Sequence, residues 1–306
     1  MSAPVACGAN HHLIRAMPVV FVLIWSTGFI VAKYGLPYAP PLSFLSIRYA
    51  LSLLCFVAWI AFARVTWPQS RKQWLHLGVT GILIHAGYLG GVWSAIKGGM
   101  GSGLSALIVG LQPVLTAVWV SRMGDASHSD NRVSSRQWLG LVLGLAGLLL
   151  VVSRKFGAGD EATPYTLACA VFALLSITAG TLYQKRFVKS ADVRSANAIQ
   201  LGAALLVTLP FAFFLESEAV QWTPNFVGAL AWSVLALTLG GSSLLYLLIQ
   251  RGAATAVTSL LYLVPPATAL MAWLLFGEAI TVVTMLGTAL TALGVWLVVR
   301  SPRGAV

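Results

Sequence analysis

The sequence predicts an all-α membrane protein with ten transmembrane helices, arranged as two inverted five-helix repeats with the N- and C-termini in the cytoplasm. Three observations predict this fold class: the composition, the spacing of apolar runs and a repeated segment. Of the 306 residues, 58% are hydrophobic and 9% are charged, and the mean hydropathy is +0.85. Because soluble domains carry about 25% charged residues, the composition excludes a soluble globular protein.

The apolar runs set the number of predicted helices. A transmembrane helix needs about 20 mostly apolar residues, and stretches approaching or exceeding this length recur along the whole chain. The ten predicted spans cover residues 18–34, 42–63, 74–96, 102–121, 138–152, 164–183, 196–215, 227–249, 256–276 and 282–299. The first follows Arg15 and could pass for a signal peptide, but the nine spans behind it favour a retained signal-anchor.

A repeated segment divides the chain into two halves. LGLVLGLAGLLLVV at 139–152 and LGTALTALGVWLVV at 286–299 are identical at seven of fourteen positions, with Gly140 matching Gly287 and Gly147 matching Gly294. We therefore predict one repeat over residues 16–153 and a second over 164–300, joined by a polar segment. An odd number of spans per repeat turns the second copy upside down relative to the first.

The basic residues indicate the orientation. The net charge is +11, and if the N-terminus is inside, fourteen of the Lys and Arg residues fall in inner segments and four in outer connections. The positive-inside rule then places both termini in the cytoplasm. The excess of basic residues thus reflects the orientation of the chain in the membrane, and no nucleic-acid partner is expected.

Residues for metal or covalent chemistry are sparse. Cys7, Cys55 and Cys169 form neither a disulfide framework nor a zinc-ligand spacing. The sequence also lacks GxSxG, HExxH and a pair of carboxylates within a span. We expect no cofactor, no metal site and no enzymatic activity.

Two spans carry proline near their middle. Residues 103–119, GLSALIVGLQPVLTAVW, contain Gln112-Pro113, and the related run at 256–273 contains Pro265-Pro266. A proline inside a helix removes a backbone donor and bends the helix. A shift of 153 residues pairs Pro113 with Pro266 and a shift of 152 pairs it with Pro265, so the counterpart stays open. Broken spans at corresponding places of two halves predict a midplane binding site.

Several motifs resemble a known family. IWSTGFIVAKYG at 24–35, LSFLSIRYALS at 42–52, the Pro-containing fourth span ending in Gly-Asp, and LVPPATALMAWLLFGEAIT at 263–281 resemble the EamA-type transporters of the drug/metabolite transporter superfamily. The resemblance implies a bacterial inner-membrane carrier, commonly an exporter of amino acids or other small metabolites, with a central cavity between the repeats. The likeness is greatest to the aromatic amino-acid exporters, although the doubled proline differs from the single one usual there.

Residue type and helical spacing suggest the candidate substrate-binding residues. Trp25 lies mid-span beside small polar residues, and His85 lies near the midplane of the third span. Gln112 can donate and accept beside a carbonyl that proline leaves free. The full set is Trp25, Ser26, His85, Tyr88, Gln112, Pro113, Ser242, Tyr246, Tyr262 and Pro266. For each serine the competing interpretation is a hydrogen bond that holds two helices together.

The positions of the charged residues restrict the possible transport mechanisms. All eight acidic residues lie in predicted loops or at span ends, while Arg48 lies inside the second span. Arg48 could extend outward to the interface, bind a helix C-terminus, or face the translocation path.

We predict facilitated export of neutral or aromatic amino acids by alternating access. Export of drugs or other metabolites, including nucleotide sugars, and a non-saturable pore are the alternatives. The expected partners are a small-molecule substrate and the lipid bilayer; the oligomeric state is left open.

Overall fold

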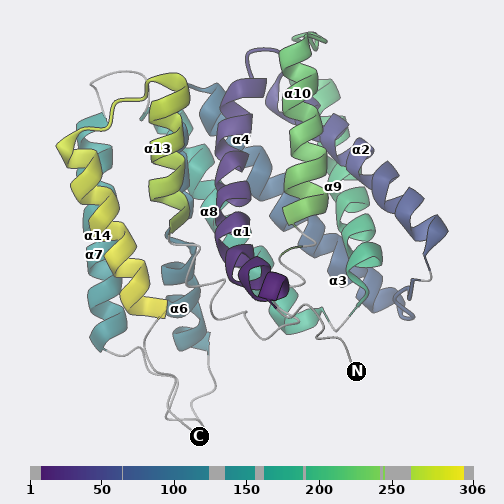
Figure 1. Cartoon of the computed structure of the whole chain (residues 1–306), viewed down its shortest axis with the longest axis horizontal. Helices are drawn as coiled ribbons and strands as arrows, with labels where there is room; N and C mark the ends of the chain where they lie inside the picture. Colours follow the sequence, from purple (N-terminus) through teal and green to yellow (C-terminus); the bar gives the residue numbers. More distant parts are fainter. Residues whose placement is uncertain are drawn as a thin grey trace, which may run out of the picture.

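The computed structural model describes residues 8–63, 65–123, 135–155, 162–188, 191–241, 244 and 263–299. Every regular element within these ranges is a helix, as the prediction requires, and none of the ranges contains a strand (Figure 1). The helices of the first half are α1 (Gly8–Gly35), α2 (Pro41–Phe62), α3 (Arg71–Gly81), η1 (Ile82–Leu89), α4 (Gly90–Lys97), α5 (Ser102–Val109), α6 (Gln112–Met123) and α7 (Ser135–Lys155). Those of the second half are α8 (Pro164–Phe187), α9 (Val193–Leu215), α10 (Pro224–Trp232), η3 (Ser233–Gly241), α13 (Val264–Phe276) and α14 (Val282–Val299).

The helix lengths suit a membrane. Five stretches are long and apolar enough to cross one by length and composition, namely Pro41–Phe62, Arg71–Lys97, Pro164–Phe187, Val193–Leu215 and Pro224–Gly241. Five shorter apolar helices, Val19–Gly35, Ser102–Thr116, Trp138–Ser153, Val264–Phe276 and Val282–Leu297, lie between and beyond them. Each of these ten stretches overlaps one of the ten predicted spans in order along the chain. The first helix begins ten residues before the predicted start of its span.

Local sequence explains where several helices begin. At the start of α8 the Thr163 hydroxyl accepts a hydrogen bond from the Thr166 N–H, and at the start of α10 the Thr223 hydroxyl accepts one from the Phe226 N–H, each at 3.2 Å. Proline follows both threonines, and its fixed φ suits the first helical position.

The third and eighth spans each contain a π-helix, which the sequence did not predict. η1 joins α3 to α4, and η3 continues α10. Moved by 153 residues, η1 covers positions 235–242 and so coincides with most of η3. Within η3 the Thr238 hydroxyl donates to the carbonyl of Ser233, five residues earlier, at 3.0 Å. π-Helical turns in helices occur frequently at functional sites.

The predicted break in the fourth span is present. α5 ends at Val109 and α6 begins at Gln112, with Gly110 and Leu111 as a turn between them. The turn is held by short-range bonds from Gly110 N to Ala106 O at 2.8 Å and from Leu111 N to Ile108 O at 3.1 Å. In the ninth span α13 begins at Val264, so both prolines lie in its first turn.

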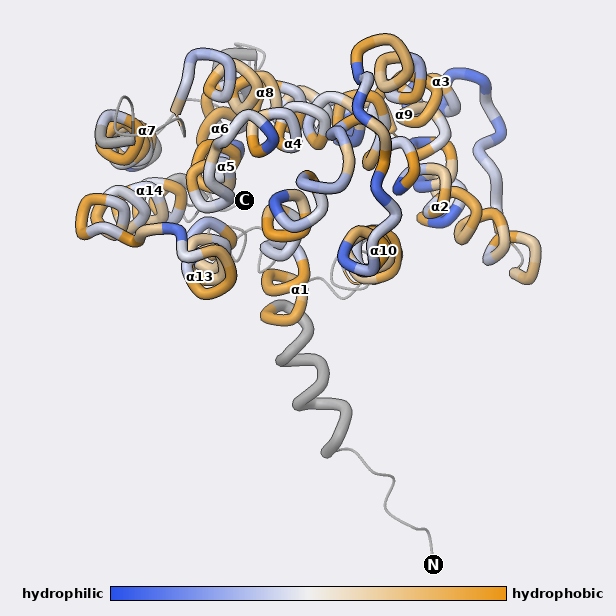
Figure 2. The backbone as a smooth tube through the Cα atoms, turned by 90° about the horizontal axis from the view of Figure 1, so that it is seen from above, coloured by the Kyte–Doolittle hydropathy of each residue, from blue (hydrophilic) through white to orange (hydrophobic). Residues whose placement is uncertain are grey.

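The helices pack in pairs that join the two halves of the chain. α7 packs along α14 at one end of the molecule and α2 along α9 at the other, as seen from above in Figure 2. Between these pairs, α1 packs against α10, η3 and α13, while α8 packs against α3, η1, α4, α5 and α6. The predicted sixth span therefore contacts the third and fourth spans. In the same way, the first span contacts the eighth and ninth spans.

Glycines set the distance between α7 and α14. A Cβ atom placed on Gly294 would lie 2.6 Å from the Gly144 nitrogen, and one on Gly287 would lie 2.6 Å from the Gly147 carbonyl oxygen. Gly140 and Gly144 give the fifth span a GxxxG face, and such a face can pack against a repeat partner in the same chain or against a second molecule. In this structure it packs against α14 of the same chain.

Two carboxylates connect the halves of the chain at one edge of the molecule. This is the edge at which α1, α4, α9 and α13 end, the upper edge in Figure 1. Glu216 accepts hydrogen bonds from the backbone N–H groups of Leu42 and Ser43, both at 2.7 Å, at the first turn of α2. Glu278 pairs with Lys33 at 2.7 Å. Both carboxylates belong to the second half of the chain and bind groups of the first, so this edge is held together across the two halves.

Candidate functional site

Polar and aromatic side chains gather where η1 faces α2 and α9. Tyr88 is buried and His85 half-buried on η1. The Tyr49 hydroxyl of α2 donates to the His85 carbonyl at 2.8 Å, and the two rings meet edge to face with centroids 6.0 Å apart. The His85 side chain hydrogen-bonds to Gln200 of α9. Two of the predicted site residues, His85 and Tyr88, thus belong to one cluster inside the fold.

Arg48 of α2 reaches the same cluster. Its Nε and Nη2 atoms both donate to the Thr238 hydroxyl of η3 at 3.2 Å, and the residue is only 8% exposed. Tyr49, the next residue of α2, binds η1 through the His85 carbonyl. Arg48 therefore does not extend to the membrane interface: it binds η3, while the neighbouring Tyr49 binds η1.

On α1, Trp25 and Ser26 have different surroundings. Trp25 is half-buried beside Phe21, with ring centroids 5.3 Å apart. Ser26 is fully buried, and its hydroxyl donates to the Val22 carbonyl of its own helix at 2.7 Å. Thr268 of α13 donates to the Ser26 carbonyl at 3.4 Å. Ser26 thus contributes its backbone to the α1–α13 contact.

The fourth and ninth predicted spans contact each other near their prolines. A Cβ atom on Gly110 would lie 2.8 Å from Cγ of Pro265, so the turn of the fourth span lies against the first turn of α13. The Gln112 side chain donates to the Thr181 hydroxyl of α8 at 3.2 Å and remains half-buried. Pro113 and Pro266 are also half-buried. Gln112 therefore ties the broken span to α8.

We expect Gly110→Ala to push α13 away from this turn, because the new methyl group would meet the Pro265 ring. Overpacking typically costs about 1–3 kcal/mol, which corresponds to a fall in Tm of roughly 3–10 °C. Gly202→Ala on α9 is the matched control, since its Cβ would meet only Leu53 at 4.0 Å. Thermal unfolding of both variants in detergent tests the contact, and equal melting temperatures would contradict it.

Three predicted residues, Ser242, Tyr246 and Tyr262, lie outside the described residues. Sequence reasoning in turn missed Tyr49, Gln200, Thr238 and Thr181, which complete the hydrogen bonds above. All four are polar or amphipathic residues inside predicted apolar spans. Their polarity within an apolar span was the signal by which the sequence could have identified them. Polar residues at such positions, however, often only hold helices together.

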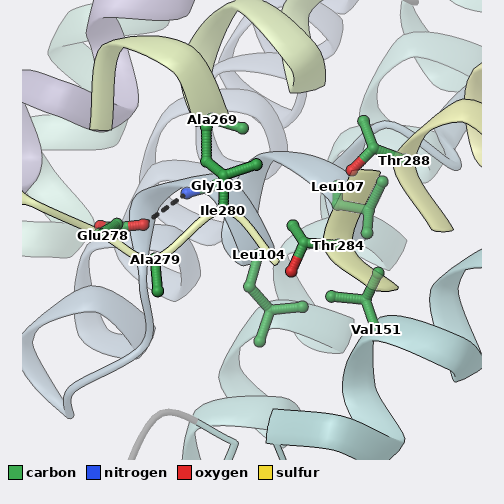
Figure 3. Close-up of a pocket in the computed structure, with 10 residues that line it drawn as sticks. All are labelled: Gly103, Leu104, Leu107, Val151, Ala269, Glu278, Ala279, Ile280, Thr284 and Thr288. Carbon is green, nitrogen blue, oxygen red and sulfur yellow. Dashed lines mark hydrogen bonds between the residues drawn. The ribbon is translucent and has the colours of Figure 1, made fainter. Parts of the chain in front are cut away.

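A small pocket lies away from this cluster, near the α13–α14 connection (Figure 3). α5 contributes Leu104 and Leu107, and α14 contributes Thr284 and Thr288. Its one carboxylate, Glu278, is already hydrogen-bonded to the backbone of α5 and paired with Lys33. Within the described ranges, no group of three His, Cys, Asp or Glu side chains could hold a metal ion. The cluster around η1 is thus the better candidate site.

Comparison with known proteins gives consistent matches over nearly the whole chain. One transporter, YvbV of Bacillus subtilis, is 27% identical over 279 residues, which cover 90% of this chain and 88% of that protein. A protein of Salmonella typhimurium, named a probable amino-acid metabolite efflux pump, is 25% identical over 290 residues, covering 92% and 93% of the two chains. A crystal structure with 17% sequence identity superposes with a TM-score of 0.64, covers 92% of this chain and 95% of that one, and supports the fold alone.

A family model supplies the assignment. The model of the EamA-like transporter family matches twice, over residues 16–153 and 165–300. The two matches together span most of the chain and include the motifs on which the resemblance was based. The resemblance is therefore confirmed, and the chain belongs to the EamA-like transporter family.

Proposed function

We propose that this multi-pass transporter of the inner membrane exports neutral or aromatic amino acids by alternating access. In this proposal ten spans form two inverted five-helix repeats with cytoplasmic termini, and the substrate site lies between the repeats. A relative in Escherichia coli, 25% identical over 279 residues, is named an inner membrane transporter. The name of the Salmonella relative, an amino-acid metabolite efflux pump, supports the substrate class.

The helix contacts support the inverted repeat. α1 contacts the eighth and ninth spans, and α8 contacts the third and fourth. Exchanging the halves turns one set of contacts into the other, as a two-fold axis in the membrane plane requires. The overlap of η1 and η3 after a shift of 153 residues supports the same relation.

The observation that carries the proposed mechanism is the contact between the broken fourth span, at Gly110, and the proline-containing first turn of α13, at Pro265, from opposite halves. A broken helix presents unpaired backbone groups and partial charges of both signs. These can bind the ammonium and carboxylate groups of a zwitterion in the middle of a membrane. Rocking of one repeat against the other would then expose the site to each side in turn.

Aromatic side chains suit an apolar substrate side chain. Trp25 and Tyr88 are predicted to contact it, and Tyr49 is buried in the same core cluster as Tyr88. Aromatic rings supply large apolar surfaces and favour offset or edge-to-face contacts with other rings. We infer that the site prefers aromatic or large neutral amino acids.

We further propose facilitated export down a concentration gradient. No acidic residue lies within the predicted spans, and coupling to protons or sodium commonly uses intramembrane carboxylates. A pH or sodium gradient imposed on proteoliposomes should then leave the accumulation of labelled phenylalanine unchanged.

Counterflow in proteoliposomes tests the proposed function. Liposomes loaded with unlabelled phenylalanine should accumulate labelled phenylalanine with saturation and stereoselectivity. Tyr88→Ala should raise the half-saturation concentration by about tenfold or more, because burial of one aromatic side chain contributes about 1.5–3 kcal/mol. Tyr34→Ala is the control, since Tyr34 is 46% exposed at the end of α1.

Three outcomes would change the proposed function or the proposed site. Flux that rises linearly with concentration and ignores stereochemistry would indicate a pore. Competition by amphipathic drugs or nucleotide sugars, without competition by amino acids, would indicate one of those substrate classes. Unchanged counterflow in both Tyr88→Ala and Trp25→Ala would place the site elsewhere.

A further inference from the structure

Arg48 is a buried cation whose described contacts do not neutralise it. It lies within α2, seven residues after Pro41, and only 8% of its surface is exposed. The ion pairs among the described residues join Lys33 to Glu278, Lys97 to Glu218 and Arg194 to Asp192. None of them includes Arg48. Arginine keeps its charge in proteins, so this charge stays in the interior of the helix bundle.

The orientation of the guanidinium leaves one edge available. Nε and Nη2 both point to a single atom, the Thr238 hydroxyl oxygen. That contact uses the side edge of the planar group. The other edge, formed by Nη1 and the second N–H of Nη2, makes no hydrogen bond to the residues that the structure describes. This free edge has the geometry that binds a carboxylate through two parallel hydrogen bonds.

The surroundings of Arg48 can supply further contacts but no negative charge. Tyr49 follows Arg48 in α2 and is buried in the same core cluster as Tyr88 of η1. The Tyr49 hydroxyl already donates to the His85 carbonyl, whereas the Tyr88 hydroxyl forms no hydrogen bond within the described part of the chain. A buried charge without a partner costs several kcal/mol, and all acidic residues of the sequence lie outside the predicted spans. Within the part of the chain that the structure describes, no carboxylate supplies this negative charge, and a bound anion would.

We propose that Arg48 binds the carboxylate of the transported solute, with the solute's apolar part directed toward Tyr88. The assignment rests on the proposed export function and deepens it, because it defines the substrates as small organic carboxylates, zwitterionic amino acids among them. It also predicts that the site discriminates against simple amines, although it has no carboxylate of its own. Thr238 is a positioning residue, since it holds the side edge of the guanidinium and leaves the other edge free.

Competition in counterflow tests this assignment on the wild-type protein. Labelled phenylalanine is the transported probe, and unlabelled phenylalanine, phenylalaninamide and phenethylamine are the competitors. Phenylalanine should compete at least about 30-fold better than either amine, because leaving a buried charge unpaired on binding weakens complexes by this factor or more. If the amines compete as well as phenylalanine, the assignment is overturned without any variant.

Variants then test whether Arg48 causes the preference for phenylalanine over the amines. Arg48→Gln should reduce the 30-fold preference to less than about threefold, and Arg48→Lys should keep part of it, because an ammonium offers charge without the planar fork. Lys97→Gln removes the same charge at the upper edge, where Lys97 pairs with the exposed Glu218, and should keep the full preference. An unchanged preference in Arg48→Gln would overturn the assignment.

Thr238→Val separates binding from a purely structural role. It removes the described hydrogen-bond partner of the guanidinium but leaves the charge, so the carboxylate preference should persist. If Thr238→Val loses the preference as completely as Arg48→Gln, then Arg48 acts by holding η3 in place, and the assignment fails. Absence of saturable counterflow for every amino acid would overturn the proposed function and this assignment together. Saturable counterflow without a carboxylate preference would overturn this assignment alone.

Discussion

Gly147→Ala is expected to destabilise the protein strongly, because the new methyl group would collide with backbone of α14. Its Cβ would lie against the Gly287 carbonyl oxygen and 2.8 Å from the Thr291 nitrogen. Backbone cannot rotate away as a side chain can, so the two helices must separate. Overpacking costs about 1–3 kcal/mol, or a fall in Tm of roughly 3–10 °C, and contact with backbone favours the upper part of this range.

The separation would also weaken a hydrogen bond between the helices. The Thr291 hydroxyl contacts the Gly144 carbonyl across the interface at 3.3 Å while it donates to the Gly287 carbonyl of its own helix at 2.9 Å. In lipid, small residues permit this close approach and polar side chains then join the backbones. The interface thus depends on glycine at several positions together.

Gly228→Ala is the matched control for this prediction. Gly228 is exposed on α10, and a Cβ there would meet nothing within 4 Å. Alanine favours an exposed helix over glycine by about 1 kcal/mol, so this variant should melt at or slightly above the wild-type temperature. Fluorescence-detected size-exclusion chromatography after heating compares the two. Equal behaviour would show that α7 and α14 do not pack in the described register.

The second large effect is expected from Glu278→Ala. Oε1 of Glu278 binds Lys33 at 2.7 Å and accepts from the Ser102 N–H at 2.9 Å, while Oε2 accepts from the Gly103 N–H at 3.4 Å. The residue before α5, Gly101, has no side chain to cap that helix. Glu278 therefore caps α5 from the opposite half of the chain, where a negative charge also suits the helix dipole.

Its removal should cost about 2–3 kcal/mol and lower the Tm by roughly 5–10 °C, because buried N–H groups lose a charged acceptor. Glu278→Gln should fall between the wild type and Glu278→Ala, since the amide oxygen still accepts. Glu218→Ala is the control: the Lys97–Glu218 pair is also 2.7 Å long, but Glu218 is 64% exposed. Exposed ion pairs contribute only about 0–1 kcal/mol.

A charge reversal distinguishes the ion pair from the cap. Lys33→Glu combined with Glu278→Lys restores opposite charges, but a lysine cannot accept hydrogen bonds from Ser102 and Gly103. The double variant should therefore remain less stable than the wild type. Recovery of the full melting temperature would mean that the ion pair alone stabilises this edge.

Local sequence determined the helices. Each span must satisfy its backbone hydrogen bonds within itself in lipid, so apolar length alone locates it, and each of the predicted ranges overlaps a described helix. Proline and glycine are equally local signals: the break predicted at Gln112-Pro113 occurs two residues earlier, at Gly110 and Leu111. The family motifs are local as well.

The tertiary structure decided which residues meet. Arg48 reaches Thr238, 190 positions away, Gln112 reaches Thr181, and Pro265 lies against Gly110. The sequence alone does not show whether the glycines of α7 pack against the repeat partner or against a second molecule. It also does not predict the π-helices that carry Tyr88 and Thr238. Hydropathy records only whether a residue prefers water or an apolar environment. Which polar group it binds depends on shape complementarity between helices far apart in the chain.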